Sequence, residues 1–359
     1  MSNFLDVFED VTKKGTKIPT EKYLKSGKYP IIDQGQSYIS GYCNDETGLF
    51  DDIPVIIFGD HTRIIKYVDQ PCFLGADGVK LLKSKDRQAN YKYLYYALCS
   101  AKIPDTGYNR HFKWLKELEI PLPPLEIQKQ IADTLDKVTH TIDLCNAILE
   151  KLDLLVKSRF IEMFGNPISN SHNLPLKTLP ELGELGRGVS KHRPRNAPEL
   201  LGGKYPLIQT GDVANANLYI YVYNATYSEI GFKQSKMWNK GTLCITIAAN
   251  IAKTAILTFD SCFPDSVVGF NANDKTNNIF IHYWFSFFQA ILEEQAPESA
   301  QKNINLKILS ELKVIVPPIA LQEQFADFVE QTDKSKLAVK QVLEKAERLK
   351  KALMQEYFG

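Results

Sequence analysis

The sequence lacks the features that mark secreted, membrane-spanning or cysteine-stabilised proteins. Its six cysteines stand singly with no CxxC pair, so the thiols are predicted to be reduced and mostly buried. No apolar run reaches the roughly 20 uninterrupted residues that a membrane-spanning helix needs. The acidic start, MSNFLDVFED, has no basic segment followed by an apolar one, as a signal peptide would. We therefore expect a cytoplasmic protein with no membrane partner.

Sequence motifs for catalysis are also missing. The chain has no GxxxxGK[ST] loop, no His/Cys/Asp group at zinc spacing, and no Asn/Asp-Pro-Pro-aromatic loop of the kind an adenine methyltransferase would show. A nuclease centre could be assembled from Asp265, Glu311 and Lys313, because carboxylates and a lysine can hold Mg²⁺ and activate water. The matching earlier segment has Glu119 in place of the lysine, which favours a structural role. We expect no catalytic residue, no metal and no cofactor in this chain.

Length and charge point to two domains and to local rather than global electrostatics. The 359 residues are 44% hydrophobic and 24% charged, and they exceed what one core usually supports. A net charge of +1 argues for neither a nucleic acid nor a membrane surface when taken over the whole chain. Basic clusters must therefore be sought locally.

The chain contains an internal repeat. The segment FIEMFG, which ends at Gly165, matches the final MQEYFG, and the match extends back without a gap over 115–165 and 309–359. Upstream, GKYPIIDQG corresponds more loosely to GKYPLIQTG. The predicted order is a first variable domain at 1–122, a helical spacer at 123–165, a second variable domain at 166–316 and a second spacer at 317–359. We call the two variable domains the heads.

Each spacer begins after a Pro-Pro pair, which ends an extended run, and continues as a heptad-patterned helix. The apolar positions of the heptads form a seam along each helix, and the polar residues Thr332, Lys336 and Lys350 interrupt the seam of the second helix. Helices of about 38 residues would span on the order of 57 Å. We predict that the two helices pair, although such heptads would serve any helical bundle. The residues expected to contact a partner helix or partner protein are Gln128, Ile131, Leu135, Leu149, Leu152, Gln322, Phe325 and Leu343.

Short apolar runs punctuated by Gly, Pro, Asn and Asp predict strands and loops inside each variable domain, and a helical segment follows them. The predicted class is α+β, with two pseudo-twofold-related α+β domains separated by two long antiparallel coiled-coil helices. Two similar heads at a set separation suit a linear partner with a local dyad, and duplex DNA has one.

Basic loops recur at the same place in both heads. The loop GRGVSKHRPRNAP and the segment TKKGTKIPTEKYLKSGKYP could contact phosphates, although a charge run is usually a solvated surface. Two loops between strands could reach base edges, because Arg and Lys suit guanine and Asn suits adenine, but ordinary hairpin residues are an equal alternative. The candidate DNA-contacting residues are Lys13, Lys14, Lys17, His61, Thr62, Arg63, Arg110, His111, Arg187, Lys191, His192, Arg193, Arg195, Asn250 and Lys253.

With these features together, the chain resembles the specificity (S) subunit of type I restriction-modification enzymes. The matching segments are RHFKWLKELEIPLPPLEIQKQIADTLDKV, EKLDLLVKSRFIEMFG, their second copies, and FGDHTRIIKYVDQPCFLGADGVKLL. The resemblance implies that each target recognition domain binds one half of a bipartite, asymmetric sequence in double-stranded DNA. It also implies two methyltransferase (M) subunits that bind S-adenosylmethionine, and restriction/translocase (R) subunits that use ATP and Mg²⁺.

Three alternatives stay open. The chain could serve an enzyme in which methylation and cleavage are fused in one partner. It could be a stand-alone metal-dependent nuclease, which the unmatched lysine disfavours. A coiled-coil scaffold that joins two protein-binding heads is the third.

Overall fold

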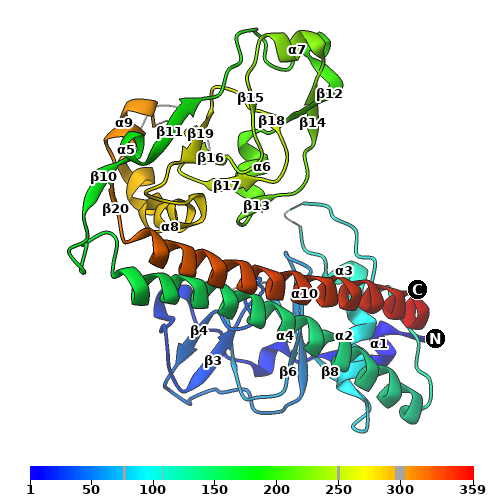
Figure 1. Cartoon of the computed structure of the whole chain (residues 1–359). Coiled ribbons are helices and arrows are strands. Elements are labelled where there is room, and N and C mark those ends of the chain that lie inside the picture. The colour runs from blue at the N-terminus through cyan, green and yellow to red at the C-terminus, as the bar shows by residue number, and fades with distance from the viewer. Residues whose placement is uncertain (76–77, 108, 249–250, 296–303) are drawn as a thin grey trace. The chain divides into compact units, whose positions relative to one another are not determined.

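The computed structural model describes residues 1–75, 78–107, 109–248, 251–295 and 304–359. These divide into two compact units, Met1–Asn146 with Lys340–Gly359, and Ala147–Val339. Each unit contains one head and one part of each 40-residue helix, α4 (Leu125–Phe164) and α10 (Ile319–Phe358) (Figure 1). Both helices begin directly after a Pro-Pro pair, where proline no longer removes a needed backbone donor.

An antiparallel sheet forms the centre of the first head, in the order β2 (Phe8–Asp10), β8 (Val79–Ser84), β5 (Val55–Gly59) and β6 (Ile65–Val68). Alternate side chains of β5 enter two apolar clusters, since successive side chains of a strand point to opposite faces. Ile56 and Phe58 face one cluster, and Val55 and Ile57 face the other. Burial on both faces explains why β5 is a continuous apolar run.

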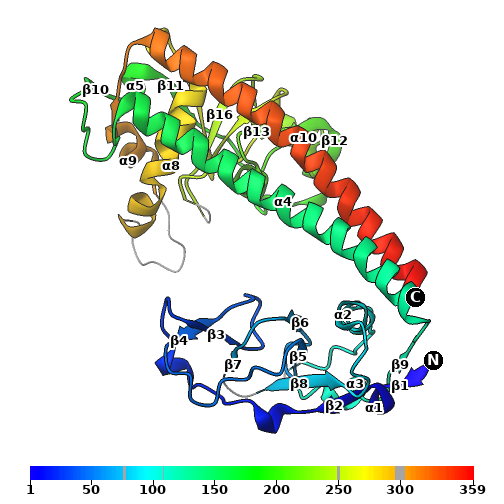
Figure 2. The same cartoon turned by 90° about the horizontal axis from the view of Figure 1, so that it is seen from below.

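Smaller elements complete this head. Figure 2 shows β3 and β4 to one side of the central sheet and α2 to the other. Strand β1 pairs with β9, which joins the start of the head to the segment that precedes α4. The remaining bounds are β1 (Ser2–Asn3), α1 (Phe4–Val7), η1 (Thr12–Lys14), η2 (Thr20–Lys22), β3 (Tyr29–Ile32), β4 (Gly41–Cys43), β7 (Phe73–Leu74), α2 (Tyr91–Cys99), α3 (Phe112–Leu115) and β9 (Glu119–Ile120).

The second head has two main sheets. One has the order β11 (Gly183–Arg187), β19 (Val267–Ala272), β16 (Leu243–Thr246), β17 (Thr254–Leu257) and β13 (Tyr219–Ile220). The other has the order β14 (Ala225–Tyr227), β12 (Leu201–Leu207), β18 (Ser261–Cys262) and β15 (Met237–Trp238). The other bounds are β10 (Leu176–Thr178), α5 (Leu179–Leu182), η3 (Pro198–Leu200), α6 (Thr210–Asn215), α7 (Glu229–Lys233), α8 (Asn278–Gln295), α9 (Leu306–Glu311) and β20 (Lys313–Ile315).

The two heads share a topology. Strands β5, β6 and β8 of the first correspond to β16, β17 and β19 of the second, with the same antiparallel pairing around the central strand. The parallel pair β3–β7 corresponds to β12–β18, and β1–β9 corresponds to β10–β20. The predicted α+β class and the duplication are therefore confirmed.

In each unit α4 and α10 run antiparallel. In the second unit, Lys336 Nζ donates to Asp153 Oδ1 at 2.5 Å, and the rings of Phe160 and Phe325 lie 5.4 Å apart, so residue numbers rise along one helix as they fall along the other. Of the three polar members of the predicted seam, Thr332 and Lys336 are buried and Lys350 is half-buried. Among the described residues, no helix is long and apolar enough to cross a membrane.

Candidate nucleic-acid interface

The basic loop of the second head leaves the sheet at the end of β11. Arg187 is paired in register with Val268 at the start of β19, and Gly188 N donates to Val267 O at 2.9 Å. A Cβ at Gly188 would lie 2.3 Å from Pro264 O, so only glycine lets the loop approach the neighbouring turn this closely. The loop after β11 therefore packs directly against the turn at 263–266.

Three arginines of this loop converge on Asp265. Arg193 Nη2 lies 3.1 Å from Asp265 Oδ2, Arg195 contacts Asp265 Oδ1, and Arg187 Nε donates to the Asp265 carbonyl oxygen. We call Arg187, Arg193 and Arg195 the arginine cluster. Two of its cations pair with the Asp265 carboxylate and the third binds the Asp265 carbonyl oxygen, so the cluster keeps a positive excess that suits an anionic partner.

The loop backbone is held from a second direction. Gln234 Oε1 accepts hydrogen bonds from Lys191 N at 2.5 Å and His192 N at 3.0 Å, and Ser235 Oγ donates to Val189 O at 2.8 Å. The side chain of Lys191 is exposed, and that of His192 lies 3.6 Å from Glu199. All five predicted DNA-contacting residues of this loop, the four cations and His192, therefore lie at the surface of one anchored segment.

The basic residues of the first head lie on a different kind of element. Lys13 and Lys14 lie in η1 and are exposed, and Lys17 follows it with an exposed side chain. Lys17 forms a parallel bridge with Leu74 through its backbone. The structure therefore places these lysines together on the surface, but on a short 3-10 turn rather than an arginine-rich loop.

The predicted base-contacting turn of the first head joins β5 to β6. Thr62 Oγ1 donates to Gln34 O at 2.7 Å, and His61 N donates to Gln34 Oε1 at 3.1 Å. Arg63 pairs with another residue of the same head, because its Nη2 lies 2.7 Å from Oδ2 of the exposed Asp105. The pKa of Asp105 is lowered by a hydrogen bond from Gly107 N and by the Arg63 guanidinium.

His111 has a structural role, because its side chain is fully buried. Its Nδ1 lies 3.0 Å from Asp60 O, and its own N donates to the same oxygen at 2.8 Å. Asp60 Oδ1 accepts from Phe112 N at 2.7 Å, which secures the start of α3. The expectation that His111 contacts DNA does not fit this position, whereas its neighbour Arg110 is exposed.

Sequence reasoning missed the loop at 33–37, which follows β3 and packs beside the turn at 61–63. Lys66 Nζ donates to Asp33 O and to Ser37 O, both at 2.7 Å, and burial lowers the pKa of this lysine. Gln36 and Ser37 are exposed. An amide such as that of Gln36 can pair with adenine, and the polar string DQGQS directly after an apolar strand was the available signal.

The corresponding turn of the second head is only partly described. Lys253 is half-buried, and its N donates to Thr246 Oγ1 at 3.1 Å. Asn250, the predicted adenine-reading residue, lies outside the described residues.

The predicted partner-contacting residues of the helices mostly pack within the chain. Gln128 Nε2 donates to Pro123 O at 2.8 Å, and Gln322 Nε2 donates to Pro317 O at 2.9 Å, so both glutamines secure a helix start. Gln128, Leu135, Gln322 and Phe325 are buried, and Ile131, Leu149, Leu152 and Leu343 are half-buried. The large apolar side chains that the helices leave exposed are instead Leu125, Ile127, Leu144, Leu154, Leu155, Ile161, Ile319, Leu321, Leu337, Val342 and Leu349.

The residues of the nuclease alternative do not form a centre. Both carboxylate oxygens of Asp265 face arginines, and Glu311 lies on α9, 3.9 Å from Lys307. Lys313 is exposed on β20. Across the parts of the chain that the structure describes, no group of three or more His, Cys, Asp or Glu residues could hold a metal ion.

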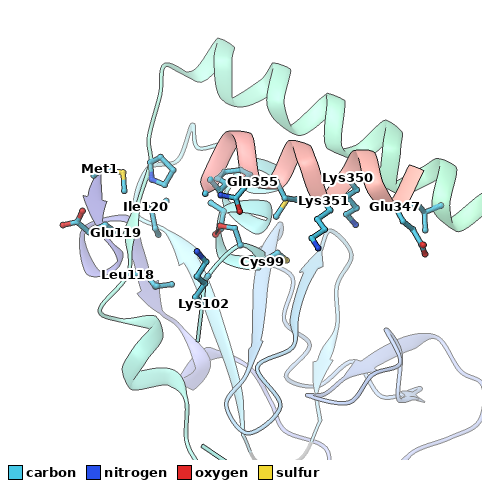
Figure 3. A pocket seen from close by; sticks show the side chains of 18 residues that line it. Met1, Cys99, Lys102, Leu118, Glu119, Ile120, Glu347, Lys350, Lys351 and Gln355 are labelled. Carbon is cyan, nitrogen blue, oxygen red and sulfur yellow. Dashed lines mark hydrogen bonds between the residues drawn. The ribbon is translucent and has the colours of Figure 1, made fainter. Parts of the chain in front are cut away.

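A cavity of about 770 Å³ lies in the first unit, where the end of α10 meets the head (Figure 3). Lys350, Lys351 and Gln355 of α10 line one part of it, and Lys102 and Ile120 of the head line another. None of the predicted DNA- or partner-contacting residues lines this cavity. It is therefore distinct from the basic loops.

The family model of the type I restriction modification DNA specificity domain matches residues 2–154 and again 176–348. The chain belongs to this family. Each match covers one head and most of the helix that follows it, as expected for a duplicated unit. The resemblance inferred from the sequence is thereby confirmed.

Several relatives carry the same description. The putative type I restriction enzyme MjaX specificity subunit of Methanocaldococcus jannaschii is 26% identical over 67% of this chain, which spans 58% of that protein's length. The putative type I restriction enzyme specificity subunit S.HindORF215P of Haemophilus influenzae is 22% identical over 91% of this chain and 86% of its own length. The crystal structure of the type I restriction-modification S subunit from M. genitalium has a TM-score of 0.66 at 19% identity, with 99% of this chain and 95% of that chain covered, which supports the fold.

Proposed function

We propose that this chain is the non-catalytic DNA specificity subunit of a type I restriction-modification complex, in which each head reads one half of a bipartite target. The observation that carries the proposal is the duplication itself. One family domain occurs twice, and each copy presents polar or basic loops on the same topology. Two non-identical copies would read two different half-sites, because the loop residues differ between the heads.

We also propose that methyltransferase subunits dock on the exposed apolar side chains of the helices. In the second unit, Leu154 and Leu155 of α4 have 63% and 48% of their surface exposed, so the described chain leaves much of both side chains uncovered. In the first unit, Val342 and Leu349 lie seven residues apart on one face of α10 and are similarly exposed. Apolar side chains left in water on a long helix are typical of a face that a partner helix covers.

In the proposed complex, S-adenosylmethionine would be bound by the methyltransferase subunits, and ATP and Mg²⁺ by restriction subunits. This chain would supply the DNA contacts and the docking surface. The proposed complex contains two methyltransferase subunits, as the resemblance to the family implies.

The test is to co-express the chain with the methyltransferase subunit of its source cell and to expose the purified complex to a pool of randomised duplexes. Sequencing of methylated products is expected to return one bipartite motif with a constant gap. Replacing residues 166–316 by the corresponding region of another family member should change one half of the motif and leave the other half intact. Methylation that does not depend on this chain, or a motif in one block, would refute the proposal.

A further inference from the structure

The arginine cluster has an arrangement that a merely solvated basic loop would not adopt. Three guanidinium groups from a nine-residue segment are drawn to one residue some seventy positions further along the chain. Like charges this close repel one another, so separate positions in water would be favoured without a shared anion. Asp265 supplies that anion to Arg193 and Arg195, and its carbonyl oxygen accepts a hydrogen bond from Arg187.

Asp265 is placed to organise the arginines without hiding them. Its side chain is 24% exposed, whereas those of Arg193 and Arg195 are 54% and 43% exposed. The carboxylate is therefore more buried than the two arginine side chains that it binds, which remain accessible to a partner. Arginine has five N–H donors in a rigid fork, so one edge can bind Asp265 while another binds a second acceptor.

The backbone contacts make this arrangement a built one. Arg193 Nη1 also donates to Ser190 O at 2.6 Å and to His192 O at 2.8 Å, so its side chain folds back onto its own loop. Gln234 holds the backbone at Lys191, and Gly188 brings the loop against the turn that contains Asp265. A side chain that is already ordered loses less entropy when it binds DNA.

We infer that Asp265 is a positioning residue that fixes the arginine cluster for recognition of the second half-site of the DNA target. The inference rests on the proposed function and adds one residue and its role. It predicts that loss of Asp265 changes nonspecific affinity and sequence discrimination in opposite directions. Removing a negative charge near DNA phosphates strengthens nonspecific binding, whereas loss of positioning weakens discrimination between the target and other sequences.

The experiment compares wild type with Asp265→Asn in the full chain bound to its methyltransferase partner. The probes are duplexes selected from a random pool by the wild-type complex, and the unselected pool. The selectivity ratio is the dissociation constant for the unselected pool divided by that for the selected duplexes. We expect this ratio to fall about tenfold or more in Asp265→Asn, since bidentate arginine contacts carry discrimination of that size. Affinity for the unselected pool should stay the same or increase.

Asp274→Asn is the matched control, because Asp274 is exposed in the same unit and the substitution removes the same charge. Its ratio should equal that of wild type. Sequencing of the duplexes that Asp265→Asn selects should show a relaxed second half-site and an unchanged first half-site. An unchanged ratio, or equal tightening on both probes, would overturn the inference.

A second variant keeps the test decisive if Asp265→Asn fails to fold. Arg195→Lys retains the positive charge and loses the planar fork, so it should reduce the ratio without reducing the salt dependence of binding to the unselected pool. A wild-type ratio in Arg195→Lys would also overturn the inference. Failure of wild type to select any sequence would instead refute the proposed function.

Discussion

Acid should destabilise the second unit through one histidine. His282 lies on α8, and its Nδ1 is 2.9 Å from Thr254 Oγ1 of β17. Burial lowers the pKa of His282 to about 4, against an ordinary value of 6.5, and the nearby charge of Lys336 adds to this effect. The folded protein therefore favours the neutral ring, and the unfolded chain takes up a proton at higher pH.

The size of the effect follows from the two pKa values. The stabilisation is fully present above pH 6.5 and is lost as pH falls from 6.5 toward 4. Between pH 7.5 and pH 5, a single group with these values removes about 2 kcal/mol from the free energy of unfolding. A loss of this size is a large part of the stability of a typical domain.

The assay is urea unfolding followed by tryptophan fluorescence at both pH values. Trp238 and Trp284 are buried in the second unit, so Trp114→Phe in all variants restricts the signal to that unit. Wild type should lose about 2 kcal/mol more than His282→Gln, whose amide can still hydrogen-bond Thr254 but cannot be protonated. His172→Gln, which changes an exposed histidine of the same unit, should behave as wild type. Equal pH dependence in wild type and His282→Gln would refute the reasoning.

Three further predictions concern the helices and the basic loop. Lys336→Met should change the free energy of unfolding of the second unit by less than about 1 kcal/mol, whereas Asp153→Ala should cost about 1–3 kcal/mol, because it leaves the buried Lys336 ammonium unpaired. Urea unfolding of both variants measures the two costs, and equal costs would contradict the prediction. Gly188→Ala should destabilise the second unit by about 1–3 kcal/mol and reduce DNA selectivity, because the added Cβ would lie 2.3 Å from Pro264 O. Unaltered unfolding and selection would show that the close approach of the loop to Pro264 is unimportant. Leu154→Asp should change stability by less than about 0.5 kcal/mol yet prevent co-purification of the methyltransferase subunit on gel filtration, and an intact complex would argue against docking at this face.

The sequence by itself determined the features that depend on local periodicity and repetition. Heptad spacing after a Pro-Pro pair is a property of neighbouring residues, so both long helices were predictable from it. The duplicated FIEMFG and MQEYFG segments likewise indicated two copies of one unit. Short strands were readable as a class, because apolar runs between turn residues have few other solutions.

Only the tertiary structure decided what each polar side chain does. A basic pattern around His61 and His111 is the same whether a ring faces solvent or, like His111, is enclosed against Asp60. The contact between Arg195 and Asp265 joins residues that are far apart in the sequence, and no local pattern encodes such a pair. Burial and charge pairing depend on which segments the fold brings together, so they arise only once the strands and helices have packed.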